Sequence, residues 1–151
     1  MLFLEPSLEN FKKHISKLKL GKKPLLGTLS AQGMLEHLTD SLDIAMSKEG
    51  DHDLEVPKER VDIAQVFLFS KHLLPRNFKA KFLPSNASNR NTELPHAISE
   101  FEKKRAEFED FFSHNPNSKA LHPSFGNLDN KYYLALHSKH ITHHFEQFGL
   151  I

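Results

Sequence analysis

Residues 133–148, with the sequence YLALHSKHITHHFEQF, hold four of the chain's eleven histidines. At about 100° per residue, a helix places His140 and His144 one turn apart on the same face. Tyr133 and His137 lie on that face as well, within an arc of apolar residues. Buried polar groups must be paired, so a core stripe that is half imidazole requires a partner for its nitrogens.

Two explanations of this stripe stay open on the helix alone. A histidine pair at positions i and i+4 on one helical face is a bidentate chelate for zinc-like ions. The histidines could instead form hydrogen bonds with one another, with Tyr133 or with backbone groups. His143 lies roughly 60° away, at the edge of the apolar arc.

Length and composition favour one globular domain, residues 1–151, with 38% hydrophobic and 26% charged residues. The net charge of +1 and the scattered lysines and arginines predict no nucleic-acid partner. The absence of cysteine excludes disulfides, thiolate ligands and cysteine nucleophiles. Neither a signal peptide nor an 18-residue apolar run is evident. We therefore expect a cytoplasmic protein that does not enter a membrane.

Apolar spacing predicts five helical segments and little strand. Ser7, Ser30 and Asp129 are suitable N-caps, and Gly21 and Gly50 are suitable stops. The fold class predicted is all-α, an up-and-down four-helix bundle with an extra short helix or irregular segment. The predicted helices cover residues 7–20, 30–48, 58–74, 96–114 and 129–148.

Other features concern single segments. In the 96–114 helix, either Ala106 or Arg105 fills an apolar position. Residues 76–95 form a long irregular connection. Within it, apolar and polar residues alternate weakly over 78–82, a pattern that suggests a short extended stretch. A connection of this length is usually functional or mobile, and it could cover one end of the helices as a lid.

His37 extends the apolar stripe of the 30–48 helix, so it faces inward or nearly so. An equal alternative is a boundary histidine paired with Glu36 or Asp40. In an up-and-down bundle this helix and the last one both face the core. That arrangement brings His37, His140 and His144 within reach of one ion.

Three stretches together carry a family resemblance: LLGTLSAQGMLEHLTDSL at 25–42, HPSFGNL at 122–128 and HITHHFEQFG at 140–149. They resemble the DinB-like (YfiT-like) superfamily of metal-binding four-helix bundles. The most similar branch has no defined function and is marked by HPxFG and a terminal HxxHHxxQFG. The resemblance spans nearly the whole chain, although the aromatic residue before the last histidines, often Trp in that branch, is replaced here by Tyr132 and Tyr133.

The resemblance implies a divalent metal held by His37, His140 and His144. Zinc or nickel is expected first, and iron and manganese also suit imidazoles with open positions. Some relatives are thiol-dependent S-transferases, so the resemblance implies a metal-dependent transferase or hydrolase that activates a thiolate or water. Without cysteine, the chain would take its thiol from a small-molecule cosubstrate. Superfamily members are often dimers, which makes a homodimer an expectation here.

Two rival hypotheses remain. One is a non-catalytic metal-binding or partner-binding helical bundle. The other has no metal and predicts that His37, His140 and His144 point apart. The roles of three further histidines stay open: His137 as a substitute ligand or outer group, His143 outside the ligand set, and His122 as a structural turn residue or part of the site's mouth. Candidates for orienting ligands or moving protons are Glu36, Asp40, Tyr133 and Gln147.

Overall fold

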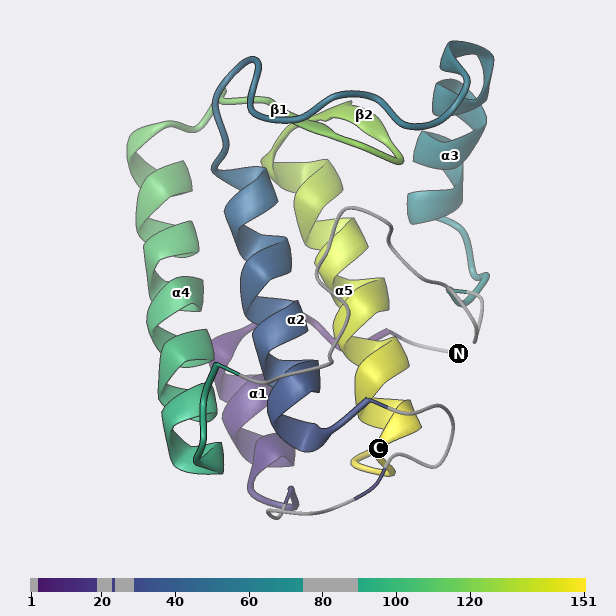
Figure 1. The fold of residues 1–151 in the computed structure, drawn as a ribbon. Helices are drawn as coiled ribbons and strands as arrows, with labels where there is room; N and C mark the ends of the chain where they lie inside the picture. The colour runs from purple at the N-terminus through teal and green to yellow at the C-terminus, as the bar shows by residue number, and fades with distance from the viewer. Residues whose placement is uncertain (1–2, 19–22, 24–28, 75–89) are drawn as a thin grey trace.

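The computed structural model describes residues 3–18, 23, 29–74 and 90–151 (Figure 1). These residues are mostly helical, as predicted, with one small two-stranded sheet. A 3₁₀ turn, η1 (Lys58–Arg60), precedes the third helix. The helices are α1 (Leu8–Ile15), α2 (Ala31–Ala45), α3 (Val61–Leu68), α4 (Leu94–His114) and α5 (Asn130–Gln147), and the strands are β1 (Ala120–His122) and β2 (Gly126–Leu128).

The three predicted N-caps are confirmed. The side chains of Ser7, Ser30 and Asp129 each accept a hydrogen bond from the backbone N–H three residues on, at 3.2, 2.9 and 3.1 Å. Each bond satisfies one of the donors that a helix start leaves unpaired. The caps therefore mark where α1, α2 and α5 begin.

The structure places α2 between α4 and α5, with α1 behind them (Figure 1). The helices α2 and α5 run in opposite directions, so the first half of α2 lies beside the second half of α5. Phe11 of α1 packs against Phe101 of α4 with ring centroids 4.3 Å apart. This contact joins α1 to α4 within the buried core.

Three predicted boundaries are wrong. α2 ends at Ala45 rather than near residue 48, because Ser47 Oγ donates to the carbonyl of Ile44 at 2.6 Å and closes the last turn. α4 begins at Leu94, two residues early, since proline is accepted in a first turn. α1 ends at Ile15. The predicted stop at Gly21 and the stretch 78–82 lie outside the described residues, as does most of the predicted lid.

The predicted helix 58–74 is also too long, since α3 ends at Leu68. Lys139 of α5 explains the end: its Nζ donates to the backbone carbonyls of Ser70, at 2.9 Å, and of His72. Those carbonyls are thereby satisfied without a helix. A helix that ran to residue 74 would have placed His72 near its C-terminus, where a cation complements the helix dipole. Because α3 ends at Leu68, His72 does not have this role.

Residues 120–128, expected as a connection, form a hairpin in which Ala120 pairs with Leu128 and His122 with Gly126. Strands of three residues are too short to show alternation in the sequence. Tyr133 Oη donates to the carbonyl of Ala120 at 2.8 Å, which ties the hairpin to the start of α5.

The hairpin depends on glycine at position 126. Its φ is +75°, and a Cβ there would lie 2.7 Å from Val61 Cγ1. Gly126→Ala is therefore expected to lower the free energy of unfolding by more than the roughly 1–2 kcal/mol of a left-handed residue alone. Gly50 is the matched control, because its φ is +90° with nothing within 4 Å. Urea denaturation of both variants measures the difference, and equal losses would contradict a role for the Val61 contact.

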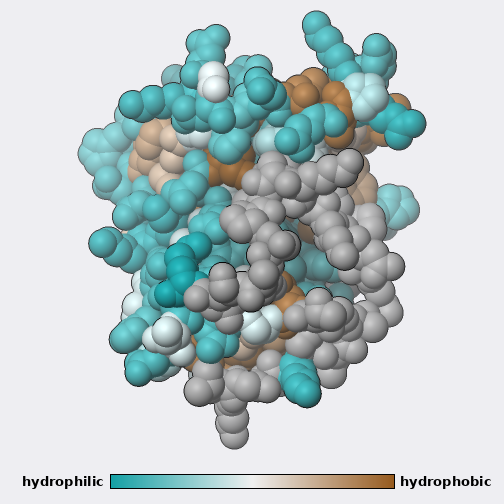
Figure 2. Space-filling view, viewed as in Figure 1, coloured by the Kyte–Doolittle hydropathy of each residue, from teal (hydrophilic) through white to brown (hydrophobic). Residues whose placement is uncertain are grey.

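Among the described residues, the most exposed large apolar side chains belong to α3 and to Phe69, which directly follows it. Ile63, Val66 and Phe69 are 74%, 72% and 50% exposed, and hydrophobic colour gathers near α3, at the upper right of Figure 2. Among the described residues, no helix combines the length and apolar character needed to cross a bilayer.

Candidate metal centre

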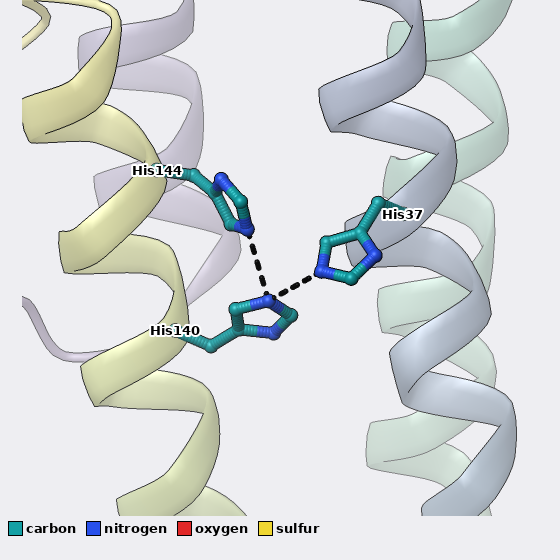
Figure 3. A group of neighbouring side chains, drawn as sticks. All are labelled: His37, His140 and His144. Carbon is teal, nitrogen blue, oxygen red and sulfur yellow. Dashed lines mark hydrogen bonds between the residues drawn. The ribbon is translucent and has the colours of Figure 1, made fainter. Parts of the chain in front are cut away.

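Three histidine rings converge between α2 and α5 (Figure 3). The Nε2 atom of His140 lies 2.8 Å from Nε2 of His37 and 3.0 Å from Nε2 of His144. One ligand atom from each ring lies within 4.8 Å of the other two, so these side chains can together hold a metal ion. The hypothesis without metal predicted that these three rings point apart. They point toward one another instead.

The hydrogen atoms of these rings cannot satisfy both short contacts. His144 Nδ1 lies 2.9 Å from Gln147 Oε1; because that oxygen accepts, the neutral His144 ring has its proton on Nδ1 and a lone pair on Nε2. If His140 Nε2 carries a proton, it can donate fully to only one neighbour. If it carries none, two lone pairs face each other across the 3.0 Å contact with His144.

A cation at the centre removes this conflict, because all three Nε2 lone pairs would point at it. Around a tetrahedral zinc ion with Zn–N distances of about 2.0–2.1 Å, ligand nitrogens lie roughly 3.3 Å apart. The two contacts of His140, at 2.8 and 3.0 Å, would need to lengthen by a few tenths of an ångström, and the third pair of nitrogens, His37 and His144, lies within 4.8 Å. The donor set therefore fits a divalent metal.

Burial keeps these imidazoles neutral. Loss of solvation, with a smaller contribution from His143, lowers the pKa of His37 to about 4. Loss of solvation and then neighbouring histidines lower the pKa of His144 to about 3 and hold that of His140 well below 6.5. Since only a neutral imidazole can ligate a metal, the three rings are in the ligating state at neutral pH.

The carboxylates beside His37 face a different partner. Glu36 accepts from the backbone N–H of Arg90 at 3.2 Å and of Asn91 at 2.6 Å, and Asp40 forms an ion pair with Arg90 at 3.0 Å. The predicted pairing of His37 with either carboxylate is therefore wrong. Both carboxylates attach residues 90 and 91 to α2 and take no part in the group of three histidines.

The other conspicuous histidines lie outside this group. Both ring nitrogens of His137 are buried without a hydrogen-bond partner among the described residues, and its ring packs 5.1 Å from that of Phe108. His143 stacks edge-on against His144 at 4.9 Å. His122 Nδ1 accepts from the backbone N–H of Ser124 at 3.0 Å, which favours its structural role in the hairpin.

Of the residues predicted to orient ligands, Gln147 contacts one of the three histidines and Tyr133 does not. Gln147 contacts a ring of the group, and its oxygen selects the tautomer of His144 that leaves Nε2 bare. Tyr133 instead donates its hydroxyl to the hairpin backbone. Burial raises the pKa of this hydroxyl, so it holds its proton and anchors β1 rather than serving the three histidines.

A buried arginine adjoins the site, and sequence reasoning gave it no role. Arg105 is 6% exposed, and it follows Phe101 and precedes Phe108 at helical spacings of four and three. That spacing was the available signal, because it places position 105 on the apolar face of α4.

Comparison of the chain with protein-family models, with curated proteins and with solved structures finds no match.

Proposed function

We propose that the chain is a metal-dependent enzyme of the DinB-like superfamily, in which His37, His140 and His144 hold one divalent ion, zinc or nickel. The observation that carries the proposal is the convergence of three Nε2 atoms, 2.8 and 3.0 Å from the central one, whose contacts neutral imidazoles cannot both satisfy. In this proposal α1, α2, α4 and α5 form the up-and-down four-helix bundle, and α3 and the hairpin are additions to it.

A divalent ion with three neutral ligands retains its charge and an open position, and it would stabilise a bound hydroxide or thiolate. The chain's own residues supply the conditions for this. Gln147 fixes the tautomer of His144, and the carboxylates of Glu36 and Asp40 are already paired with other groups. No cysteine competes for the ion, so a thiol would arrive as a small-molecule cosubstrate.

Metal content tests the first half of the proposal. Protein purified without a histidine tag is expected to contain about one equivalent of metal, directly or after incubation with zinc or nickel. The His37→Ala variant is expected to contain little, because α2 would contribute no ligand. Elemental analysis measures both. Wild-type protein that stays metal-free after incubation would refute the site.

Cobalt substitution tests the second half. Cobalt(II) in a three-histidine site with an open position is expected to change its visible spectrum when a small thiol is added, with a sulfur-to-cobalt charge-transfer band. A spectrum that responds to pH but not to thiols would favour the hydrolase type. A spectrum unchanged by either would support the rival proposal, a non-catalytic metal-binding or partner-binding bundle.

A further inference from the structure

A small cavity of about 20 Å³ lies between the start of α1 and the helices α2, α4 and α5, and it reaches His140. By the usual space requirement of a buried water, it has room for one or two waters, and a carboxylate would place its two oxygens at such positions. Among its polar lining residues, Ser7 caps α1 and Ser41 donates to the carbonyl of His37 at 2.8 Å. Arg105, His137 and His140 also line it.

Arg105 is a buried cation whose desolvation outweighs the favourable charges of Glu109 and Glu5, so that its pKa is lowered. Within the described part of the chain, its Nε and Nη1 atoms have no hydrogen-bond partner. The one ion pair given by the described residues joins Nε to Glu109 Oε1 at 3.6 Å, beyond hydrogen-bonding distance, and the Glu109 side chain is 52% exposed. One face of the guanidinium covers the ring of Phe108 at 4.6 Å. A buried charge with unmet donors is costly, and an anion beside it would offset that cost.

The two histidines of the cavity also lack acceptors. Both ring nitrogens of His137 are buried and unpartnered within the described part of the chain. His140 uses Nε2 for its contacts with the other two rings, and its Nδ1 lies on the side of the ring away from His144 (Figure 3). A ligating imidazole normally donates its second N–H to an acceptor. His144 has Gln147 for this purpose, whereas His140 Nδ1 has no hydrogen bond to a described residue, and His140 lines the cavity.

We propose that this cavity binds the carboxylate group of a small organic acid. Its oxygens accept hydrogen bonds from the guanidinium of Arg105, from His137 and from the Nδ1–H of His140. The last contact rests on the proposed function, because it assumes that His140 Nε2 faces a metal. A planar carboxylate matches the fork of a guanidinium. Such an anion would bind next to the three-histidine site and orient one of its rings.

Acetate is the probe for this site. Metal-free protein with ¹⁵N-labelled histidine is titrated with sodium acetate at constant ionic strength, and the ring signals are followed by NMR. We expect saturable shifts for His137, whose contact with the carboxylate does not depend on a metal. Arg105→Gln is expected to weaken acetate binding at least about tenfold, and Arg105→Lys, which keeps the charge but loses the fork, to weaken it less. Arg60→Gln, at an exposed arginine of η1, is the matched control and should bind acetate normally.

Several outcomes overturn the inference. Shifts in wild-type protein that grow linearly, or equally with chloride, would mean that the cavity holds water only, and this result does not depend on any variant folding. Normal acetate binding by folded Arg105→Gln would remove the arginine from the site. Butyrate and hexanoate distinguish the source of the carboxylate: retained affinity indicates the end group of a larger substrate, and lost affinity indicates a free small anion.

Metal content of the same samples separates this inference from the proposed function. Protein that binds metal but not acetate refutes the carboxylate site alone. Protein that binds acetate through Arg105 and His137 but takes up no metal refutes the metal site alone. The His144→Ala variant provides a further check, because it should lose metal and still bind acetate.

Discussion

Lowering the pH from 7 to about 4 is expected to unfold the metal-free protein. Burial is the main cause that lowers the pKa of six histidines, His143 among them, below the 6.5 expected in an unfolded chain. Between the folded and unfolded pKa values the unfolded chain binds more protons, so stability falls as the pH falls. Each such group removes about 1.4 kcal/mol per pH unit. The pKa is lowered to about 4 for His37, to about 3 for His122, His137 and His144, and well below 6.5 for His140.

Urea denaturation at pH 7, 6, 5 and 4 measures this effect. A typical domain is stable by only about 5–15 kcal/mol, so the combined loss exceeds the whole stability before pH 4. His137→Leu is the informative variant, because the ring nitrogens it removes have no hydrogen-bond partner in the described structure. Its stability should fall less steeply, by about 1.4 kcal/mol per pH unit. A flat wild-type profile would contradict the buried neutral histidines.

His140→Ala is expected to abolish stoichiometric metal binding. Its Nε2 contacts both other rings, at 2.8 and 3.0 Å, so its loss leaves His37 and His144 without the central ligand. Affinity for zinc should fall on the order of a hundred- to a thousandfold. Titration calorimetry with a competing chelator measures the affinity, and circular dichroism checks that the helix content persists.

His143→Ala is the control for that experiment. His143 lies on the same helix and its ring packs against His144 at 4.9 Å, but it is not one of the three converging residues. Its variant should bind metal as wild type does. Wild-type affinity in His140→Ala, or an equal loss in His143→Ala, would show that the converging rings are not the metal site.

Helical periodicity placed the three converging histidines on inward faces, although it placed His137 there as well. His140 and His144 share a face at any helix phase, and His37 joins the core stripe of α2 through its spacing to the apolar residues of that helix. The position of a residue around its own helix depends only on nearby sequence, so it can be predicted without knowledge of the tertiary fold. The opposite orientation of α2 and α5 then follows from helices that alternate in direction.

What the sequence could not show depends on contacts between distant residues. Lys139 ends α3 by binding carbonyls 69 and 67 residues away. The carboxylate of Glu36 accepts hydrogen bonds from Arg90 and Asn91, which lie 54 and 55 positions later. Its place next to His37 in the sequence had suggested a pairing with that histidine instead. The charge of Arg105 predicts an exposed side chain, whereas its position on the helix predicts a buried one. Only the packing of the folded protein decides between these two predictions.

The ligand set also determines when an ion can stabilise the fold. His37 and His140 lie 103 residues apart, whereas His140 and His144 are neighbours that even an unfolded chain keeps close. An ion held by all three would act as a reversible cross-link that closes a loop of about a hundred residues, a constraint comparable in chain entropy to a disulfide worth about 4–5 kcal/mol. Because His140 and His144 are close in sequence, an unfolded chain could still bind an ion weakly through them, and that binding would reduce the stabilisation. The ligand from α2 is therefore the one that couples metal affinity most directly to the tertiary fold.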